Sequence, residues 1–196
     1  MKREYLETIK VCDGKVYNLA YHQKRYEGVL VEYAQEPKLL QDFIDPPKEG
    51  LYRCRLLYNA KEILSVSFHP YKKRSVLSLK LIDALDLEYA KKYADRSALD
   101  ALFEKREGCD DILMVKNGFV RDTSIANIAL LKDGIWYTPK EPLLRGTTRE
   151  RLLDEGKIVE DYIGVDTLDS FESIALMNAM IDFDIIQNKS VEEVVC

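Results

Sequence analysis

Three dipeptides of the Asp-Gly or Asn-Gly kind separate β-prone runs, and each predicts a tight hairpin. In a type I′ turn both central residues have a positive φ, which Gly, Asn and Asp tolerate best. The predicted strand pairs are Tyr5–Val11 with Lys15–Leu19 around Asp13-Gly14, Ile112–Val115 with Phe119–Thr123 around Asn117-Gly118, and Ile128–Leu131 with Ile135–Thr138 around Asp133-Gly134. A fourth hairpin is predicted to join Leu51–Tyr58 to Ile63–Phe68 through Asn59–Glu62.

Apolar residues at spacings of three and four predict three helices between these strands. They cover Tyr21–Gln35, with Pro37 and Pro46-Pro47 beyond it, Ser97–Arg106, and Thr148–Glu155, with Gly156 as the C-cap. Because strands and helices segregate and do not alternate strictly, the sequence predicts an α/β fold of the mixed α+β class.

A polar, basic stretch with a proline, His69–Arg74, lies between two strand-like runs and predicts a domain boundary. We expect a small N-terminal α/β domain over residues 1–70, a linker over 71–77, and a larger, β-rich, cofactor-binding domain over 78–196. The alternative is a loop inside a single domain.

Composition narrows the class of protein. The net charge of −5 argues against binding to nucleic acid, whose partners usually carry a basic surplus. No apolar run approaches the length of a membrane span, and Met1-Lys2-Arg3-Glu4 does not open a signal peptide. We therefore expect a cytoplasmic protein with no membrane partner and with reduced thiols at Cys12, Cys54, Cys109 and Cys196.

The sequence gives little support to two common kinds of site, a structural zinc site and a hydrolase triad. The cysteines show no C-x-x-C spacing and the only histidines are His22 and His69, so a zinc site of the finger or ribbon type is not expected. The chain has no G-x-S-x-G motif, which argues against a Ser-His-Asp hydrolase.

Four local patterns could carry chemistry. Gly146-Thr147-Thr148 opens a helix and could bind phosphate, although a plain threonine N-cap explains it equally. Lys91-Lys92 could supply an amine for a Schiff base or could be a solvated charge cluster. Asp122 shares a strand face with Val120, where a carboxylate needs a cationic partner unless the strand lies at an edge.

The fourth pattern is His22 and Arg25, three residues apart and therefore on one face of the predicted helix. Arg25 could meet a phosphate or a carboxylate, or form a surface ion pair. Together the four patterns supply the parts that hold pyridoxal 5′-phosphate: an amine for its aldehyde, an acid for its ring nitrogen, and a helix terminus with an arginine for its phosphate.

The order of these motifs resembles the class IV aminotransferase family, the fold-type IV pyridoxal-phosphate enzymes. This family includes branched-chain and D-amino-acid aminotransferases and 4-amino-4-deoxychorismate lyase. The resemblance rests on Leu6–Val11, Asp13–Val16, His22–Arg25, Lys92–Arg96, Asp110–Leu113, Asp122–Asn127, Tyr137–Pro139, Leu144–Arg149 and Met177–Met180. It implies a two-domain fold with the cofactor between the domains, Arg25 coming from the small domain and the other site residues from the large one.

The resemblance also implies roles for single residues. Lys92 would be the Schiff-base lysine, because the family's lysine stands four residues before a polar partner, here Arg96. Asp122 stands where the family usually has a glutamate that faces the pyridine nitrogen. The remaining cofactor-binding residues implied are Arg25, Asn127, Gly146, Thr147, Thr148, Asn178 and Ala179.

The first-choice activity is that of a 4-amino-4-deoxychorismate lyase, releasing pyruvate and 4-aminobenzoate by β-elimination through a Lys92 aldimine, in folate biosynthesis. It rests on Met177-Asn178-Ala179-Met180, which resembles the Asn-Ala-Leu block of these lyases. The alternative is an aminotransferase for branched-chain or D-amino acids, because Gly146-Thr147-Thr148-Arg149 is closer to the phosphate turn of aminotransferases. A non-catalytic cofactor binder is a further alternative.

The partners expected are a small amino substrate and a second copy of the chain in a homodimer, the latter implied by the family alone. Arg53, Arg55 and Arg145 are candidates to bind a substrate carboxylate, against the alternative of surface charge on an edge strand. The sequence departs from the family in starting at the Glu7-Thr8 block, where relatives usually have preceding strands, and in carrying Asp122 in place of glutamate.

Overall fold

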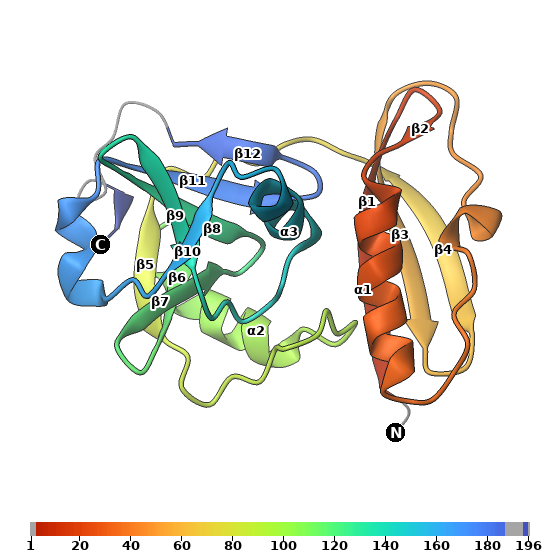
Figure 1. Cartoon of the computed structure of the whole chain (residues 1–196), viewed down its shortest axis with the longest axis horizontal. Helices are drawn as coiled ribbons and strands as arrows, with labels where there is room; N and C mark the ends of the chain where they lie inside the picture. The colour runs from red at the N-terminus through yellow and green to blue at the C-terminus, as the bar shows by residue number, and fades with distance from the viewer. Residues whose placement is uncertain (1–2, 187–193, 196) are drawn as a thin grey trace. The chain divides into compact units, whose positions relative to one another are not determined.

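The computed structural model describes residues 3–186 and 194–195, and within it the chain divides into two compact units (Figure 1). The first unit runs to Lys73 and also includes Lys91–Asp95. The second unit comprises Arg74–Ala90 and the chain from Arg96 onward. The mixed α+β class predicted from the sequence is confirmed, with a separate β-sheet in each unit.

The first unit is an antiparallel sheet with one long helix packed on it. Its strand order is β2-β1-β3-β4, which places β3 in the interior of the sheet and not at an edge. The elements are β1 (Glu4–Cys12), β2 (Lys15–Val16), α1 (Leu19–Val31), the 3-10 helix η1 (Leu40–Phe43), β3 (Leu51–Asn59) and β4 (Ile63–Pro70).

Alternation along the strands divides this sheet into an apolar face and a basic face. Tyr5, Ile9 and Val11 of β1 pack with Cys54, Leu56 and Tyr58 of β3 and with Tyr26, Val29 and Leu30 of α1. The opposite face carries Lys10, Arg53 and Arg55, and the register sets Lys10 directly across from Arg53. Glu7 belongs by alternation to the apolar face, where it is fully buried.

The return of Lys91–Asp95 to the first unit corrects the predicted domain assignment, which put these residues in the larger domain. The cause is backbone pairing with the start of β1. The amide of Leu6 donates to the carbonyl of Lys92 at 2.9 Å, the amide of Ala94 donates to the carbonyl of Glu4 at 3.0 Å, and Tyr5 and Tyr93 form an antiparallel bridge. Because β2 is only two residues long, it leaves part of one edge of β1 unpaired. The hydrogen bonds with Lys92 and Ala94 pair backbone groups on that edge.

The second unit is built on a larger sheet with the order β10-β9-β8-β7-β6-β5, to which β11 and β12 add beside β8. Its elements are β5 (Leu79–Asp83), α2 (Ser97–Phe103), η2 (Glu104–Arg106), β6 (Asp111–Lys116), β7 (Phe119–Thr123), β8 (Asn127–Lys132), β9 (Ile135–Pro139), α3 (Thr147–Asp154), β10 (Val159–Asp161), η3 (Val165–Ser170), β11 (Ser173–Asn178) and β12 (Asp182–Ile185). Leu113, Ile128, Leu130 and Ile174 form the centre of its core and are fully buried.

The four predicted hairpins are confirmed, and the helices differ from their predicted ranges only at the ends. The strand predicted over Lys15–Leu19 stops at Val16, because Asn18 takes a left-handed φ of 53° and Leu19 begins α1. The helix predicted over Tyr21–Gln35 ends at Val31, and the one predicted over Ser97–Arg106 finishes as the 3-10 turn η2. The strands β5, β10, β11 and β12 were not predicted from the sequence.

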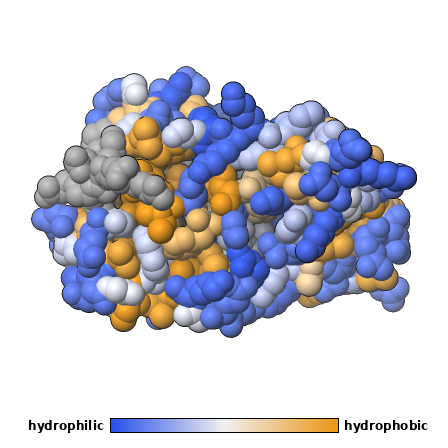
Figure 2. Space-filling model, turned by 90° about the horizontal axis from the view of Figure 1, so that it is seen from above, coloured by the Kyte–Doolittle hydropathy of each residue, from blue (hydrophilic) through white to orange (hydrophobic). Residues whose placement is uncertain are grey.

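The visible face of the molecule is mostly hydrophilic (Figure 2). Figure 2 shows one face on which charged and polar side chains predominate and apolar side chains lie among them. No helix in the described part of the chain is long and apolar enough to cross a membrane. Cys12, Cys54 and Cys109 are free thiols, whereas Cys196 lies outside the described residues.

Two glycines test how backbone conformation contributes to stability. Gly118 has a φ of +77° in the β6–β7 turn, and Gly28 lies inside α1; a methyl group added at either would meet no atom within 4 Å. We expect Gly118→Ala to lower the free energy of unfolding by about 1–2 kcal/mol, because a side chain disfavours the left-handed region. Gly28→Ala should raise it by about 0.5–1 kcal/mol, because alanine loses less backbone entropy in a helix. Denaturant unfolding of both variants measures this, and effects of the same sign would contradict it.

Candidate functional site

The residues that the sequence singled out fall into two groups, one in each unit. Arg25 and Lys92 lie in the first unit. Asp122, Asn127, Gly146, Thr147, Thr148, Asn178 and Ala179 lie in the second. Each group is described by itself below.

In the first unit Arg25 is paired with a carboxylate that the sequence analysis did not identify as a site residue. Arg25 Nε donates to Glu7 Oε1 at 2.8 Å, and Arg25 Nη2 donates to Glu7 Oε2 at 2.5 Å. His22 Nδ1 lies 2.6 Å from the same Oε2. His22 and Arg25 share a face of α1, as their spacing predicts, and that face lies over β1, which supplies Glu7.

Glu7 and His22 are both fully buried, and their ionisation is set by each other and by Arg25. Burial alone would raise the pKa of Glu7, but the Arg25 charge and the hydrogen bond with His22 bring it down to about 2. Burial lowers the pKa of His22, and the positive charges of Arg25 and Lys92 lower it further, against the effect of Glu7. At neutral pH this is therefore an ionised carboxylate between a guanidinium and a neutral imidazole.

Lys92 is held beside this group by the backbone pairing with β1 described above. Its carbonyl accepts from Leu6, the residue before Glu7. The charge of Lys92 is also one of the causes that lower the pKa of His22. The neighbouring Lys91 forms an ion pair with Glu32, the residue that caps α1. The two lysines are therefore in different electrostatic surroundings.

In the second unit Asp122 is a buried carboxylate held by neutral donors. It is 4% exposed, near the end of β7. Asn127 Nδ2 donates to its Oδ1 at 2.7 Å, and the amide of Leu144 donates to its Oδ2 at 2.9 Å. Burial raises the pKa of Asp122 to about 6, although these hydrogen bonds and the charge of Arg149 act in the opposite direction.

Asn127 connects Asp122 to the turn that precedes α3. Its Nδ2 also donates to the carbonyl of Leu144 at 2.8 Å, so the same amide fixes both the carboxylate and the turn. Gly146 leaves room for this side chain, because a Cβ at its position would overlap Asn127 Oδ1. The structure thus brings Asp122, Asn127 and Gly146 together, as the sequence predicts for one site.

The N-terminus of α3 follows directly. Thr147 and Thr148 are its first two residues and are buried, and Gly146 before them offers no side chain to cap their amides. Unpaired amides at a helix N-terminus bind anions such as phosphate. Arg149, fully buried, anchors the helix by donating to the carbonyl of Pro139 at 2.9 Å and to Glu160 Oε1 at 2.5 Å.

Asn178 supports the same region from the end of β11. Its Nδ2 donates to the carbonyl of Ile125 at 3.2 Å, within the loop between Asp122 and Asn127. Its Oδ1 accepts from the amides of Met180 at 2.9 Å and Ile181 at 3.1 Å, which orders the β11–β12 turn around Ala179. The Asn178 side chain therefore holds two backbone segments, the loop at Ile125 and the β11–β12 turn.

Each of these two groups, taken by itself, offers chemistry that suits a part of pyridoxal phosphate. A buried carboxylate whose hydrogen bonds come from neutral donors suits a protonated ring nitrogen, and uncapped amides at α3 suit a phosphate. The lysine and arginine that such a cofactor also needs are Lys92 and Arg25. The residues present are therefore compatible with the cofactor.

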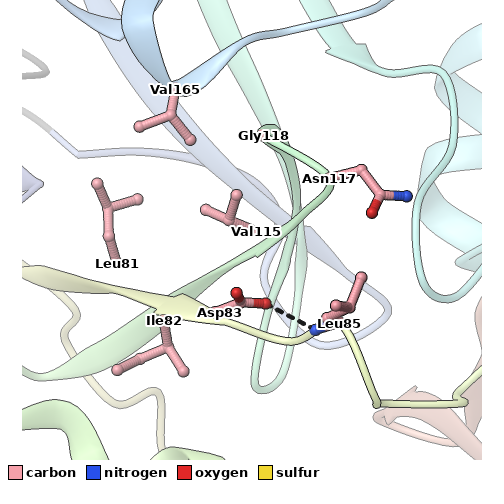
Figure 3. A pocket seen from close by; sticks show the side chains of 8 residues that line it. All are labelled: Leu81, Ile82, Asp83, Leu85, Val115, Asn117, Gly118 and Val165. Carbon is pink, nitrogen blue, oxygen red and sulfur yellow. Dashed lines mark hydrogen bonds between the residues drawn. The ribbon is translucent and has the colours of Figure 1, made fainter.

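The other candidate arginines are surface residues. Arg53 and Arg55 are exposed on the basic face of the first unit, and the side chain of Arg145 is 67% exposed. A separate cavity of about 320 Å³ lies in the second unit, near the β6–β7 turn (Figure 3). It is lined by Leu81, Ile82, Asp83, Leu85, Val115, Asn117, Gly118 and Val165, and includes none of the candidate residues.

Asp122 makes the stability of the cofactor-free protein depend on pH. Because its native pKa of about 6 exceeds the ordinary 3.8, the native state binds the proton more tightly than the unfolded state. The stabilisation from this proton is complete only well below pH 4 and is lost as pH rises through 6. Relative to Asp122→Asn, we expect the unfolding free energy of wild type to rise by roughly 2.5 kcal/mol between pH 7 and pH 4, measured by denaturant unfolding. A difference that does not vary with pH would contradict the assignment.

Gly146→Ala tests the contact between the turn and Asn127. The added methyl group would push Asn127 from the position in which it holds Asp122, so we expect a loss of about 1–3 kcal/mol in unfolding free energy. In an Asn127→Ala background the obstructing oxygen is gone, and the same substitution should cost much less. Equal costs in the two backgrounds would show that the contact does not matter.

Two relatives match about nine-tenths of this chain. An uncharacterised protein of Haemophilus influenzae is 39% identical over 181 residues, covering 89% of this chain and 96% of its own. A crystal structure from Haemophilus somnus, provisionally named a 4-amino-4-deoxychorismate lyase, superposes with a TM-score of 0.85 at 33% identity, covering 92% of this chain and 97% of that one.

A hypothetical aminotransferase of Mycobacterium tuberculosis, solved with pyridoxal phosphate bound, shares the fold with a TM-score of 0.79 at 18% identity, covering 98% of this chain and 81% of that one. The family model described as amino-transferase class IV matches residues 4–187. Since that match spans both units and every candidate residue, the chain belongs to the class IV aminotransferase family.

Proposed function

We propose that this protein is a pyridoxal-phosphate-dependent 4-amino-4-deoxychorismate lyase, which releases pyruvate and 4-aminobenzoate and would act in folate biosynthesis. Membership of the class IV family supports an enzyme with this cofactor. The name given to the Haemophilus somnus relative supports the lyase.

Two sets of residues would hold the cofactor. Arg25 and the amides of Thr147 and Thr148 suit its phosphate, and Asp122 suits its ring nitrogen. When bound, pyridoxal phosphate supplies an aldehyde that bonds to amines and a ring that accepts electrons withdrawn from the substrate.

Lys92 would bond to the cofactor in the resting enzyme and act on the substrate once displaced. As a neutral amine, its Nζ can take the proton from the carbon that bears the substrate's amino group. The adjacent carbon then loses its ether oxygen as enolpyruvate, and the ring becomes aromatic.

Asp122 would keep the ring nitrogen protonated. Its pKa of about 6 lies below neutral pH, so the carboxylate is mostly ionised there even without a cation in hydrogen-bond contact. A pyridinium beside it would favour the ionised form further. Asn127 and the amide of Leu144 hold both carboxylate oxygens in place.

Asn178 is the single observation that carries the preference for the lyase over an aminotransferase. It occupies the block that resembles the Asn-Ala-Leu of the lyases, and its side chain is engaged in ordering the Ile125 loop and the β11–β12 turn. Aminotransferases usually carry a Gly-Thr or Thr-Thr type block there, with hydroxyls that this chain lacks. The feature that favours an aminotransferase is the Gly146–Arg149 turn, and the Mycobacterium tuberculosis relative bears that name.

Turnover in the absence of an oxo acid, the amino-group acceptor that an aminotransferase needs, tests this proposal. The protein loaded with pyridoxal phosphate is incubated with 4-amino-4-deoxychorismate and no oxo acid, and pyruvate and 4-aminobenzoate are followed together. We expect equimolar, catalytic release of both. Lys92→Ala should lower the rate by about 100-fold or more, because it removes the general base. Lys91→Ala is the matched control and should retain the activity, because Lys91 pairs with Glu32.

Absence of product from a fully loaded protein would contradict the lyase. A positive result in a screen of amino donors against oxo acids would then establish the aminotransferase alternative. Equal losses in Lys91→Ala and Lys92→Ala would contradict the assignment of the lysine.

A further inference from the structure

Glu7 is the most completely enclosed charge in the first unit. Its side chain is fully buried, yet it accepts hydrogen bonds from Arg25 at 2.8 and 2.5 Å and contacts His22 at 2.6 Å. The carboxylate comes from β1, and both partners come from one face of α1. Three side chains from two elements are therefore tied at a single point.

The contact between Glu7 and Arg25 restrains the guanidinium in two directions. One carboxylate oxygen receives Nε–H and the other receives Nη2–H, a fork that fixes both the position and the plane of the group. A single hydrogen bond would leave the arginine side chain able to rotate about it. Arg25 thus has one preferred orientation before any ligand is present.

Arg25 is the partly exposed member of this group. The side chains of Glu7 and His22 are 0% exposed, whereas that of Arg25 is 16% exposed. The carboxylate that orients the arginine is therefore shielded from water, while the arginine side chain itself is not completely enclosed.

His22 completes the support of Glu7 as a neutral imidazole. An ionised carboxylate only accepts hydrogen bonds, so the proton between them belongs to His22 Nδ1. Nε2 is then the bare nitrogen, and it has no hydrogen-bond partner among the residues that the structure describes. The imidazole therefore holds Glu7 Oε2 in place without adding a second positive charge beside Arg25.

We propose that Glu7 is a positioning residue for the cofactor's phosphate: it holds Arg25 oriented for that phosphate, with His22 as its second support. The proposal rests on the proposed function, which assigns Arg25 to the phosphate. Glu7 does not touch the phosphate and acts through Arg25 alone. The three residues Glu7, His22 and Arg25 then serve one purpose, which is to orient the guanidinium for the phosphate.

The experiment compares two ligands that differ only in the phosphate. Pyridoxine 5′-phosphate and pyridoxine lack the aldehyde, so neither can bond to Lys92, and the ratio of their dissociation constants reports on phosphate recognition. Both are titrated calorimetrically into the cofactor-free protein. We expect Glu7→Gln to reduce the wild-type preference for the phosphate ester by about tenfold, the effect of one charge-assisted hydrogen bond. Combining it with Arg25→Lys should reduce the preference no further than Arg25→Lys alone.

The matched control is Gln23→Ala on the same helix. Gln23 also makes three side-chain hydrogen bonds, to Glu27, to the carbonyl of Lys38 and from the amide of Leu40, and none involves Glu7. It should leave the ligand preference unchanged even if it destabilises α1. A merely structural role for Glu7 would give the same result in Glu7→Gln, and would overturn the proposal while leaving the cofactor assignment intact. A wild-type protein with no preference for the phosphate ester would overturn both.

A measurement on wild type keeps the test independent of how well Glu7→Gln folds. Nitrogen-15 relaxation of the Arg25 Nε–H group, assigned with Arg25→Lys, reports how restrained the side chain is without ligand. We expect an order parameter near about 0.85, as for rigid backbone. A value in the flexible range, below about 0.6, would contradict positioning by Glu7.

Discussion

The first unit depends on one constraint: a carboxylate removed from water must be matched by charge and hydrogen bonds. Glu7 points to the apolar face of its sheet because alternation along β1 gives it no other direction. Arg25 and His22 meet that requirement from α1, and in doing so they lock the helix onto the sheet. The pairing contributes to the fold and leaves an oriented, partly exposed arginine.

The second unit treats its buried carboxylate differently. Asp122 has hydrogen bonds from neutral groups, and its pKa is raised, whereas that of Glu7 is lowered. A carboxylate of this kind gains most from a cation that arrives with a ligand. The same amide of Asn127 that holds Asp122 also holds the turn before α3, so the acid and the anion-binding helix end are coupled by one side chain.

Local signals in the sequence predicted the elements that local chemistry determines. The hairpins followed from Asp-Gly and Asn-Gly turns, and α3 followed from Gly146 and its threonines. β5 and β10 were not predicted, because they pair in parallel with strands distant in sequence and no turn dipeptide precedes or follows the pairing. The pairing of Arg25 with Glu7 escaped notice because it joins residues 18 apart on different elements. Glu7 offered one signal, a charge in the apolar phase of a predicted strand, and the return of Lys91–Asp95 to β1 offered none.

The central claim is that Lys92, and not its neighbour, is the residue that bonds to the cofactor. Reduction of the protein loaded with pyridoxal phosphate by borohydride, followed by peptide mapping, tests it directly, because reduction makes the bond permanent. The structure and the family resemblance predict a single labelled lysine, Lys92. A label on Lys91, which the structure pairs with Glu32, or no label on a saturated protein would contradict the account.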